Sequence, residues 1–187
     1  HMSYWGVATE FAGRFGGQVK MPELASLKVG KALLTLKNES ELCLRYTATI
    51  LEVDDLSKIL QPEILYPLEV AEIHSIDAAV DTTNLVNLEL GQPTHLFDAD
   101  KIKGGITIRL SRQHETAHLL FQEKPTILPG NTLVIADDEK ILAIAGVIGC
   151  EVSKVTTKTK RMILESATFE PVTVRKTARA LKINTDS

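Results

Sequence analysis

The chain of 187 residues carries 24 acidic and 21 basic side chains, so its formal net charge is −3. This balance excludes a protein that holds nucleic acid through a large basic surplus, and two cysteines are too few for a disulfide framework. No apolar run approaches the ~20 residues of a membrane helix, so the composition predicts a cytoplasmic globular protein without a membrane contact. His1 and Met2 are typical of a cloning remnant and are left out of the fold prediction.

Apolar residues recur every three or four positions, as in amphipathic helices, in several segments of the chain. The predicted helices cover residues 3–16, a segment that opens at Pro62, residues 78–90 and residues 171–181. Short apolar runs with β-branched residues between turn signals predict strands. These lie at residues 32–36, 43–53, 106–110, 132–137, 140–146 and 161–166.

Helices and strands are intermixed without a regular alternation, so we predict an α+β fold with mixed or antiparallel sheets packed with helices. We expect a helical lead-in over residues 1–38 and one α+β domain over residues 39–187. The chain stops at Ser187 directly after the last predicted helix, which suggests a piece of a longer protein.

The segment HETAH matches the H-E-x-x-H zinc pattern. On a helix, His114 and His118 would share one face and Glu115 could activate a metal-bound water. A third ligand would have to come from His74, His95 or a distant carboxylate. The alternative, which we favour, is an exposed turn of a β-hairpin without a metal.

Residues 80–98 concentrate hydrogen-bonding side chains on a predicted helix and the turn after it. They are Asp81, Thr83, Asn84, Gln92, His95 and Asp98. Such side chains either cap the turn or line a pocket, and the residues alone leave both interpretations open.

Three further positions are informative. Gly146 and Gly149 are typical of places where the backbone passes close to another group. Glu165 follows a strand-like apolar run, so its carboxyl is either part of a salt bridge or a binding group. Cys150 has no base nearby in the sequence, which favours a buried, inert thiol.

Four motifs follow one another in a fixed order, and the segment SYWGVATE precedes them. They are VDTTNLVNLELGQPTHLFDADKI, LVIADDEKILAIAGVIG, VTTKTKRMILESATFEP and RKTARALKINTDS. In this order and spacing the chain resembles the β subunit of bacterial phenylalanyl-tRNA synthetase, in its editing (B3/B4) domain.

The resemblance implies that this domain hydrolyses tyrosine from mischarged tRNA(Phe), because a phenylalanine pocket cannot strongly reject an added hydroxyl. It implies that Glu165 accepts a hydrogen bond from the phenol and that His95 is the catalytic residue, positioning the water or the terminal ribose. The other implied substrate-binding residues are Thr83, Asn84, Gly146, Gly149, Thr185 and Ser187.

The resemblance also implies the setting of the domain. No cofactor or metal belongs to the domain itself, whereas the full enzyme ligates phenylalanine to tRNA(Phe) with ATP and magnesium. The implied partners are the 3′ end of tRNA(Phe), the synthetase α subunit and the remaining β domains in an α2β2 enzyme, and the isolated chain is expected to be monomeric. The net charge of −3 predicts weak tRNA affinity for these residues alone.

Two departures from the family matter, and the first of them keeps a second interpretation open. The family usually has Gly-Gly where this chain has Gly149-Cys150, and the position of Ser187 is often alanine. The alternative function is therefore an architectural synthetase domain in which editing has decayed.

Overall fold

The computed structural model describes residues 3–20, 24, 26, 30, 33–57 and 60–183. The chain divides into two compact units, each built from two separate segments. The helical unit comprises residues 1–33 and 57–94, and the sheet unit comprises residues 34–56 and 95–187. Among the described residues, no helix is both long and apolar enough to cross a membrane.

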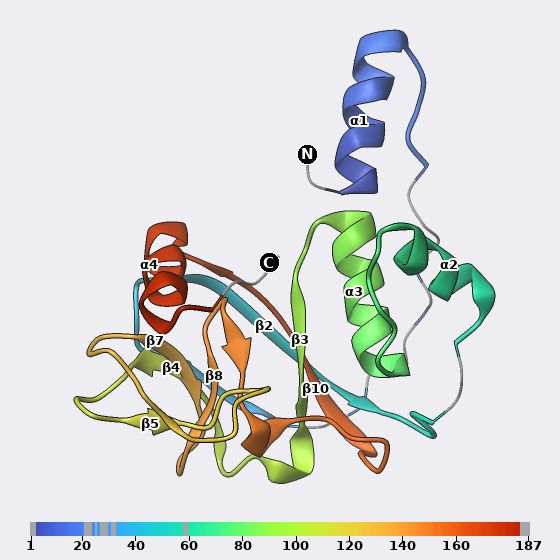
Figure 1. Cartoon of the computed structure of the whole chain (residues 1–187). Helices are drawn as coiled ribbons and strands as arrows, with labels where there is room; N and C mark the ends of the chain where they lie inside the picture. The colour runs from blue at the N-terminus through green and yellow to red at the C-terminus, as the bar shows by residue number, and fades with distance from the viewer. Residues whose placement is uncertain are drawn as a thin grey trace. The chain divides into compact units, whose positions relative to one another are not determined.

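The helical unit contains α1 (Tyr4–Phe15), α2 (Pro62–Val70) and α3 (Ala78–Leu90), as predicted (Figure 1). Capping explains where two of them begin. Ser3 Oγ accepts from the Gly6 N–H at 3.1 Å at the start of α1, and one carboxyl oxygen of Asp77 accepts from two N–H groups at the start of α3. Gly91 ends α3 in the left-handed conformation, with φ of 73°, which glycine adopts without a steric cost.

The sheet unit holds the predicted mixed and antiparallel strands, which confirms the α+β class. A five-stranded sheet has the order β1 (Thr35–Asn38), β4 (Gly105–Leu110), β7 (Leu133–Ala136), β8 (Ile141–Ile144) and β9 (Ile148–Gly149). A three-stranded sheet places β10 (Arg161–Phe169) between β2 (Cys43–Glu52) and β3 (Thr94–Asp98), and β10 pairs with β2 in antiparallel orientation. The hairpin strands β5 (Thr116–Ala117) and β6 (Thr126–Ile127) and the helix α4 (Pro171–Leu181) complete the unit.

The first strand differs from its prediction. The apolar run predicts residues 32–36, whereas β1 covers Thr35–Asn38 and pairs in parallel with β4. In the observed register Thr35 lies opposite Gly105, the first residue of β4, and the pairing runs from there to Asn38. Tertiary pairing decides this boundary, and local composition does not encode it.

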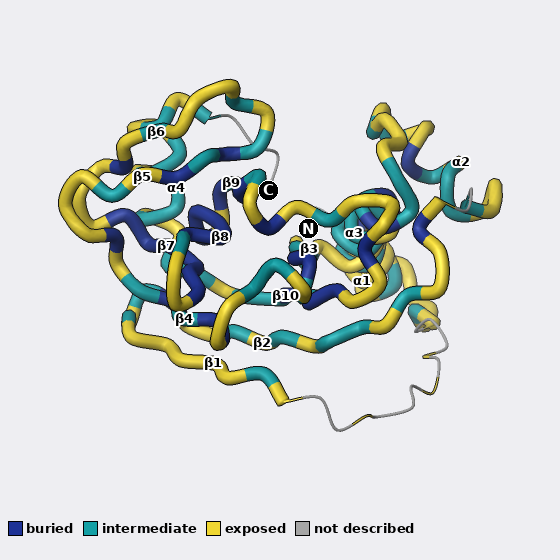
Figure 2. Tube along the Cα trace, turned by 90° about the horizontal axis from the view of Figure 1, so that it is seen from below, coloured by how far each residue is buried: buried dark blue, intermediate teal, exposed yellow. Residues whose placement is uncertain are grey.

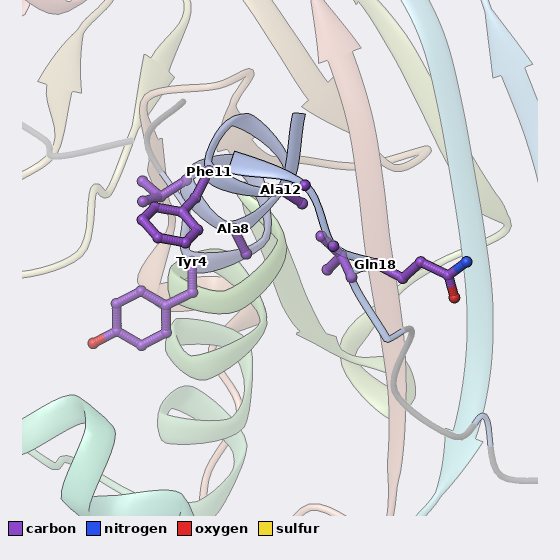
Figure 3. Close-up of a pocket in the computed structure, with 9 residues that line it drawn as sticks. Tyr4, Ala8, Phe11, Ala12 and Gln18 are labelled. Carbon is purple, nitrogen blue, oxygen red and sulfur yellow. The ribbon is translucent and has the colours of Figure 1, made fainter. Parts of the chain in front are cut away.

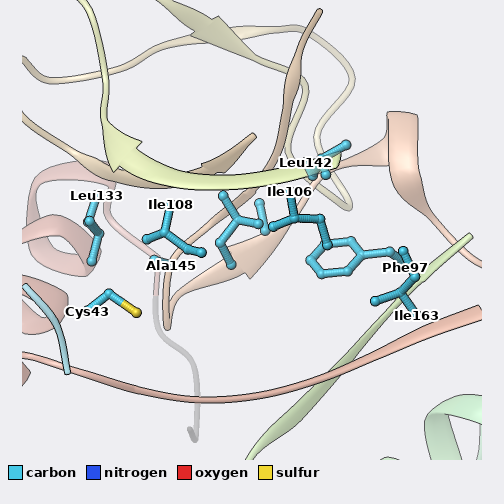
Figure 4. Close-up of a cluster of buried hydrophobic side chains, with 10 residues drawn as sticks. Cys43, Phe97, Ile106, Ile108, Leu133, Leu142, Ala145 and Ile163 are labelled. Atoms are coloured by element: carbon cyan, nitrogen blue, oxygen red, sulfur yellow. The ribbon is translucent and has the colours of Figure 1, made fainter. Parts of the chain in front are cut away.

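Two apolar clusters lie on opposite faces of the five-stranded sheet. Ile106 of β4 packs with Phe97 of β3 and Ile163 of β10 in the first cluster, which fills the space between the two sheets (Figure 4). In β8, Leu142 joins this first cluster while its neighbour Ile141 joins the second, toward α4 and β5. Because alternate residues of a strand point to opposite faces, burial on both sides explains the continuous apolar runs of β7 and β8, which are buried throughout (Figure 2).

Candidate functional site

Glu165 lies on the inner face of the three-stranded sheet, among apolar side chains. It sits two residues after Ile163 on β10, so both side chains are on the face that packs against the first apolar cluster. Glu165 is only 6% exposed, and its Oε2 atom has no hydrogen-bond partner among the described residues. Burial raises the pKa of this carboxyl to about 8. A carboxyl without a partner at this depth costs free energy unless a ligand completes its hydrogen bonds.

Tyr46 of β2 approaches the same carboxyl. Its hydroxyl lowers the pKa of Glu165 in part, while burial first and then the Glu165 charge raise the pKa of Tyr46. The Tyr46 hydroxyl is itself buried, and it lies outside hydrogen-bonding geometry with any described group. The inner face therefore holds two neighbouring polar groups that are both unsatisfied.

The ring of His95 on β3 lies against Phe97 and against the backbone of Gly149. Its ring packs edge-on against Phe97, with ring centroids 4.7 Å apart and an interplanar angle of 71°. A Cβ atom added at Gly149 would lie 2.6 Å from His95 Cε1 and 2.7 Å from Nε2, so only glycine leaves room for the ring. Although the residue is only half-buried, its ring is enclosed, and burial lowers the pKa of His95 to about 4. The imidazole is therefore neutral near pH 7.

The turn from β8 to β9 needs a second glycine. Gly146 has φ of 68°, and a Cβ atom there would lie 3.0 Å from Val174 Cγ2 and 3.2 Å from Phe169 Cδ2. Cys150 follows β9, is 1% exposed and packs in the second cluster. Burial, with a smaller effect of the Glu151 charge, raises the pKa of this thiol to about 12, so it is inert as expected.

The remaining predicted site residues lie elsewhere or outside the description. Thr83 and Asn84 belong to α3 of the helical unit, and both are half-buried. Thr83 Oγ1 donates to the Val80 carbonyl at 2.7 Å within its own helix. Thr185 and Ser187 lie outside the described residues. The sheet unit thus contains Glu165, His95 and both glycines of the predicted set.

The two aspartates of the polar segment have structural roles. Asp81, 2% exposed, accepts from Ser75 Oγ at 2.5 Å and from the Ile76 N–H at 2.9 Å, which fixes the loop before α3. Asp98 accepts from Thr159 Oγ1 at 2.7 Å. The interpretation as turn-capping groups is therefore correct for these two residues.

The zinc interpretation of HETAH is wrong. The segment is not helical, since His114 has φ of 59° and the next residues form β5. Glu115 is bound to the Arg109 guanidinium at 2.6 and 2.9 Å, and His118 Nε2 bonds to the Gln122 carbonyl at 2.8 Å. The two histidines therefore cannot share a helix face, and the described residues contain no group of three or more metal-ligating side chains.

A recess in the helical unit is a separate feature. It is lined by the apolar face of α1 and residues 16–19, with Tyr4 and Phe11 among its walls (Figure 3). None of the predicted site residues lines it. In the sheet unit, α4 and its C-terminal residue Lys182 carry four exposed cations: Arg175, Lys176, Arg179 and Lys182.

A family model described as the B3/4 domain matches residues 42–187. The chain belongs to the B3/4 domain family. It is 39% identical over its whole length to a phenylalanine–tRNA ligase beta subunit of Pseudomonas fluorescens, of which it covers 24%. It is also 39% identical, over 97% of its length, to the corresponding subunit of Protochlamydia amoebophila, of which it covers 23%. The chain thus spans about a quarter of the length of these curated relatives.

The fold is also found in a solved structure. A crystal structure of an N-terminal fragment of the phenylalanyl-tRNA synthetase beta subunit from Pyrococcus horikoshii superposes with a TM-score of 0.58. The match covers 81% of this chain and 48% of that one, at 18% identity. At this identity the likeness establishes the shared fold, and the sequence relatives establish the similarity to beta subunits.

Proposed function

We propose that this chain is a post-transfer editing domain that hydrolyses tyrosine from mischarged tRNA(Phe). The observation that carries the proposal is the buried Glu165 carboxyl with an unpaired Oε2. The phenol of tyrosine is the group that distinguishes it from phenylalanine, and it supplies the missing hydrogen bond. Phenylalanine would leave the carboxyl unpaired, at a cost of about 1–3 kcal/mol.

The chemistry requires few groups, because an aminoacyl ester is already activated. A water oxygen attacks the carbonyl carbon, the bond between that carbon and the ribose oxygen breaks, and the ribose oxygen takes a proton. His95, neutral near pH 7 and fixed between Phe97 and Gly149, is the group that we assign to holding this water or the terminal ribose. The mechanism uses no covalent nucleophile, which is consistent with the protonated, buried thiol of Cys150.

The proposed partner is the 3′ end of tRNA(Phe). The exposed cations at α4 suit the phosphates of the last nucleotides. Thr83, Asn84, Thr185 and Ser187 complete the proposed substrate-binding set. Ligation with ATP and magnesium, and the association with an α subunit and further β domains in an α2β2 enzyme, belong in this proposal to the longer cytoplasmic enzyme.

The architectural alternative rested on Cys150, and the structure supplies a different role for that residue. Its side chain packs with Leu119 in the second cluster, whereas Gly149 is the residue that faces His95. The cysteine therefore fills the core behind β9 and leaves the ring contact of His95 unobstructed.

The direct test is deacylation of tyrosyl-tRNA(Phe) by this chain and by an intact synthetase that carries it. We expect Glu165→Ala and His95→Ala to abolish the release of tyrosine. Glu52→Ala, which removes an exposed carboxylate from the neighbouring strand, is the matched control and should release tyrosine at the wild-type rate. Unchanged release in both site variants would refute the editing function.

A further inference from the structure

The register of the three-stranded sheet brings Tyr46 to Glu165. Glu165 lies directly opposite Ala48, and Tyr46 lies directly opposite Ala167. Tyr46 and Glu165 are thus diagonal neighbours on one face, a spacing of about 7–8 Å between Cα atoms that long side chains bridge. Each long side chain faces an alanine across the ladder.

The two polar groups lack hydrogen-bond partners in the described part of the chain, and a hydroxyl group of a ligand could supply both. Glu165 Oε2 and the Tyr46 hydroxyl are both buried, and neither has a hydrogen-bond partner among the described residues. The Tyr46 hydroxyl lies close enough to Glu165 to lower the pKa of that carboxyl, yet the two groups do not meet hydrogen-bond geometry. A hydroxyl placed between them can donate to the carboxyl and accept from Tyr46 at the same time, whereas an aromatic C–H can do neither.

We propose that Tyr46 is a second specificity-determining residue, whose hydroxyl donates a hydrogen bond to the phenol oxygen of a misattached tyrosine while that phenol donates to Glu165 Oε2. This inference rests on the proposed editing function. It extends the recognition from one contact to a pair that reads the phenol as donor and as acceptor. A phenylalanyl ester would leave both groups unpaired, so the pair rejects the correct product more strongly than Glu165 does alone.

Tyr46→Phe isolates this contact, because it removes one oxygen and keeps the ring that packs against the first cluster. We expect kcat/KM for hydrolysis of tyrosyl-tRNA(Phe) to fall about tenfold, the loss of one hydrogen bond. Hydrolysis of phenylalanyl-tRNA(Phe) should stay the same or rise, because one unpaired group is gone. Tyr66→Phe, at a tyrosine that is 67% exposed on α2, is the control and should leave both reactions unchanged.

The ratio of the hydrolysis rates for the two substrates distinguishes a lost contact with the phenol from a general disturbance of packing. An equal loss on both substrates, or wild-type values on both, would overturn the role of Tyr46. Glu165→Ala in the same assay tests the underlying function: if it leaves tyrosine release intact, the editing proposal itself fails. If Glu165→Ala abolishes release while Tyr46→Phe behaves as wild type, only the inference about Tyr46 fails.

Discussion

Asp137 and Glu165 are two carboxylates of the sheet unit with nearly the same burial, 7% and 6% exposed, and with opposite surroundings. Asp137 lies in the turn between β7 and β8, where it binds the Lys140 ammonium at 2.9 Å and accepts from three backbone N–H groups at 2.7–3.0 Å. Burial acts to raise the pKa of Asp137, but these partners outweigh it and the pKa is lowered. For Glu165, burial prevails and the pKa rises to about 8.

The two carboxyls differ in their hydrogen-bond partners. A buried carboxylate with a full set of donors holds a turn together, and a ligand would find no free lone pair of suitable direction on it. A buried carboxyl that lacks donors contributes nothing to the turn or strand around it, and its unmet hydrogen bonds are available to a substrate. Burial alone does not distinguish the two; the set of partners does.

The largest expected effect on stability comes from removing Asp137, the carboxylate that has a full set of partners. Asp137→Ala leaves Lys140 and three N–H groups without their acceptor, so we expect the free energy of unfolding to fall by about 3 kcal/mol. Urea unfolding measures this loss, with Glu139→Ala, an exposed neighbour in the same turn, as the control. A change below roughly 0.5 kcal/mol, which is the scatter of surface substitutions, would show that the turn does not depend on Asp137.

The raised pKa of Glu165 should make the free energy of unfolding depend on pH. Its pKa is about 8 in the folded chain against an ordinary value of 4.5, so the folded state binds the extra proton between these limits and loses stability as the pH rises. His95, with its pKa lowered to about 4, acts in the opposite direction only below pH 6.5. Between pH 6.5 and 8 the free energy of unfolding should therefore fall by about 2 kcal/mol through Glu165.

Glu165→Gln removes this titration, so the difference between the variant and the wild type in urea unfolding should grow across that pH range. Glu52→Gln, at an exposed position of β2, should keep the wild-type slope. Parallel slopes for Glu165→Gln and the wild type would mean that Glu165 is ionised in the folded chain as it is in water. Asp137 affects the pH dependence of stability in the opposite direction. Its pKa is lowered in the folded chain, so the stability that it contributes is lost only as the pH falls into the acidic range.

The smallest expected change in stability concerns His95 of the proposed site. Gly149→Ala places a methyl group within 2.7 Å of the His95 ring, so we expect a loss of about 1–2 kcal/mol and a displaced ring. Tyrosine release should fall while phenylalanine release stays low. Gly130→Ala is the matched control, since a Cβ atom there meets nothing within 4 Å. Full editing activity in Gly149→Ala would remove His95 from the mechanism.

Local signals in the sequence predicted most of the secondary structure. Helix ends follow from residues such as Ser3, Gly91 and Pro171, whose conformational preferences act within one turn. The segment HETAH shows the limit of a pattern considered alone. In the structure His114 has a positive φ, Glu115 forms an ion pair with Arg109, and the next residues form β5.

The site was predictable only where a motif pointed to it. The resemblance indicated Glu165 and His95, but residue chemistry alone left Glu165 undecided between an ion pair and a binding group. Tyr46 gave no signal, because its proximity to Glu165 depends on the register between strands more than 100 positions apart, which composition does not encode. Cys150 was ambiguous for the same reason: the face to which β9 turns it follows from tertiary packing.

The position of β10 between β2 and β3 has a consequence for the synthesis of this chain on the ribosome. The two outer strands, Cys43–Glu52 and Thr94–Asp98, emerge before their shared partner Arg161–Phe169. Residues 99–160 take roughly 3–12 s to translate at 5–20 residues per second, and the nascent chain keeps two unmatched strands for that time. The last strand to arrive also carries Glu165, so a truncated nascent chain lacks the carboxyl on which the proposed function depends.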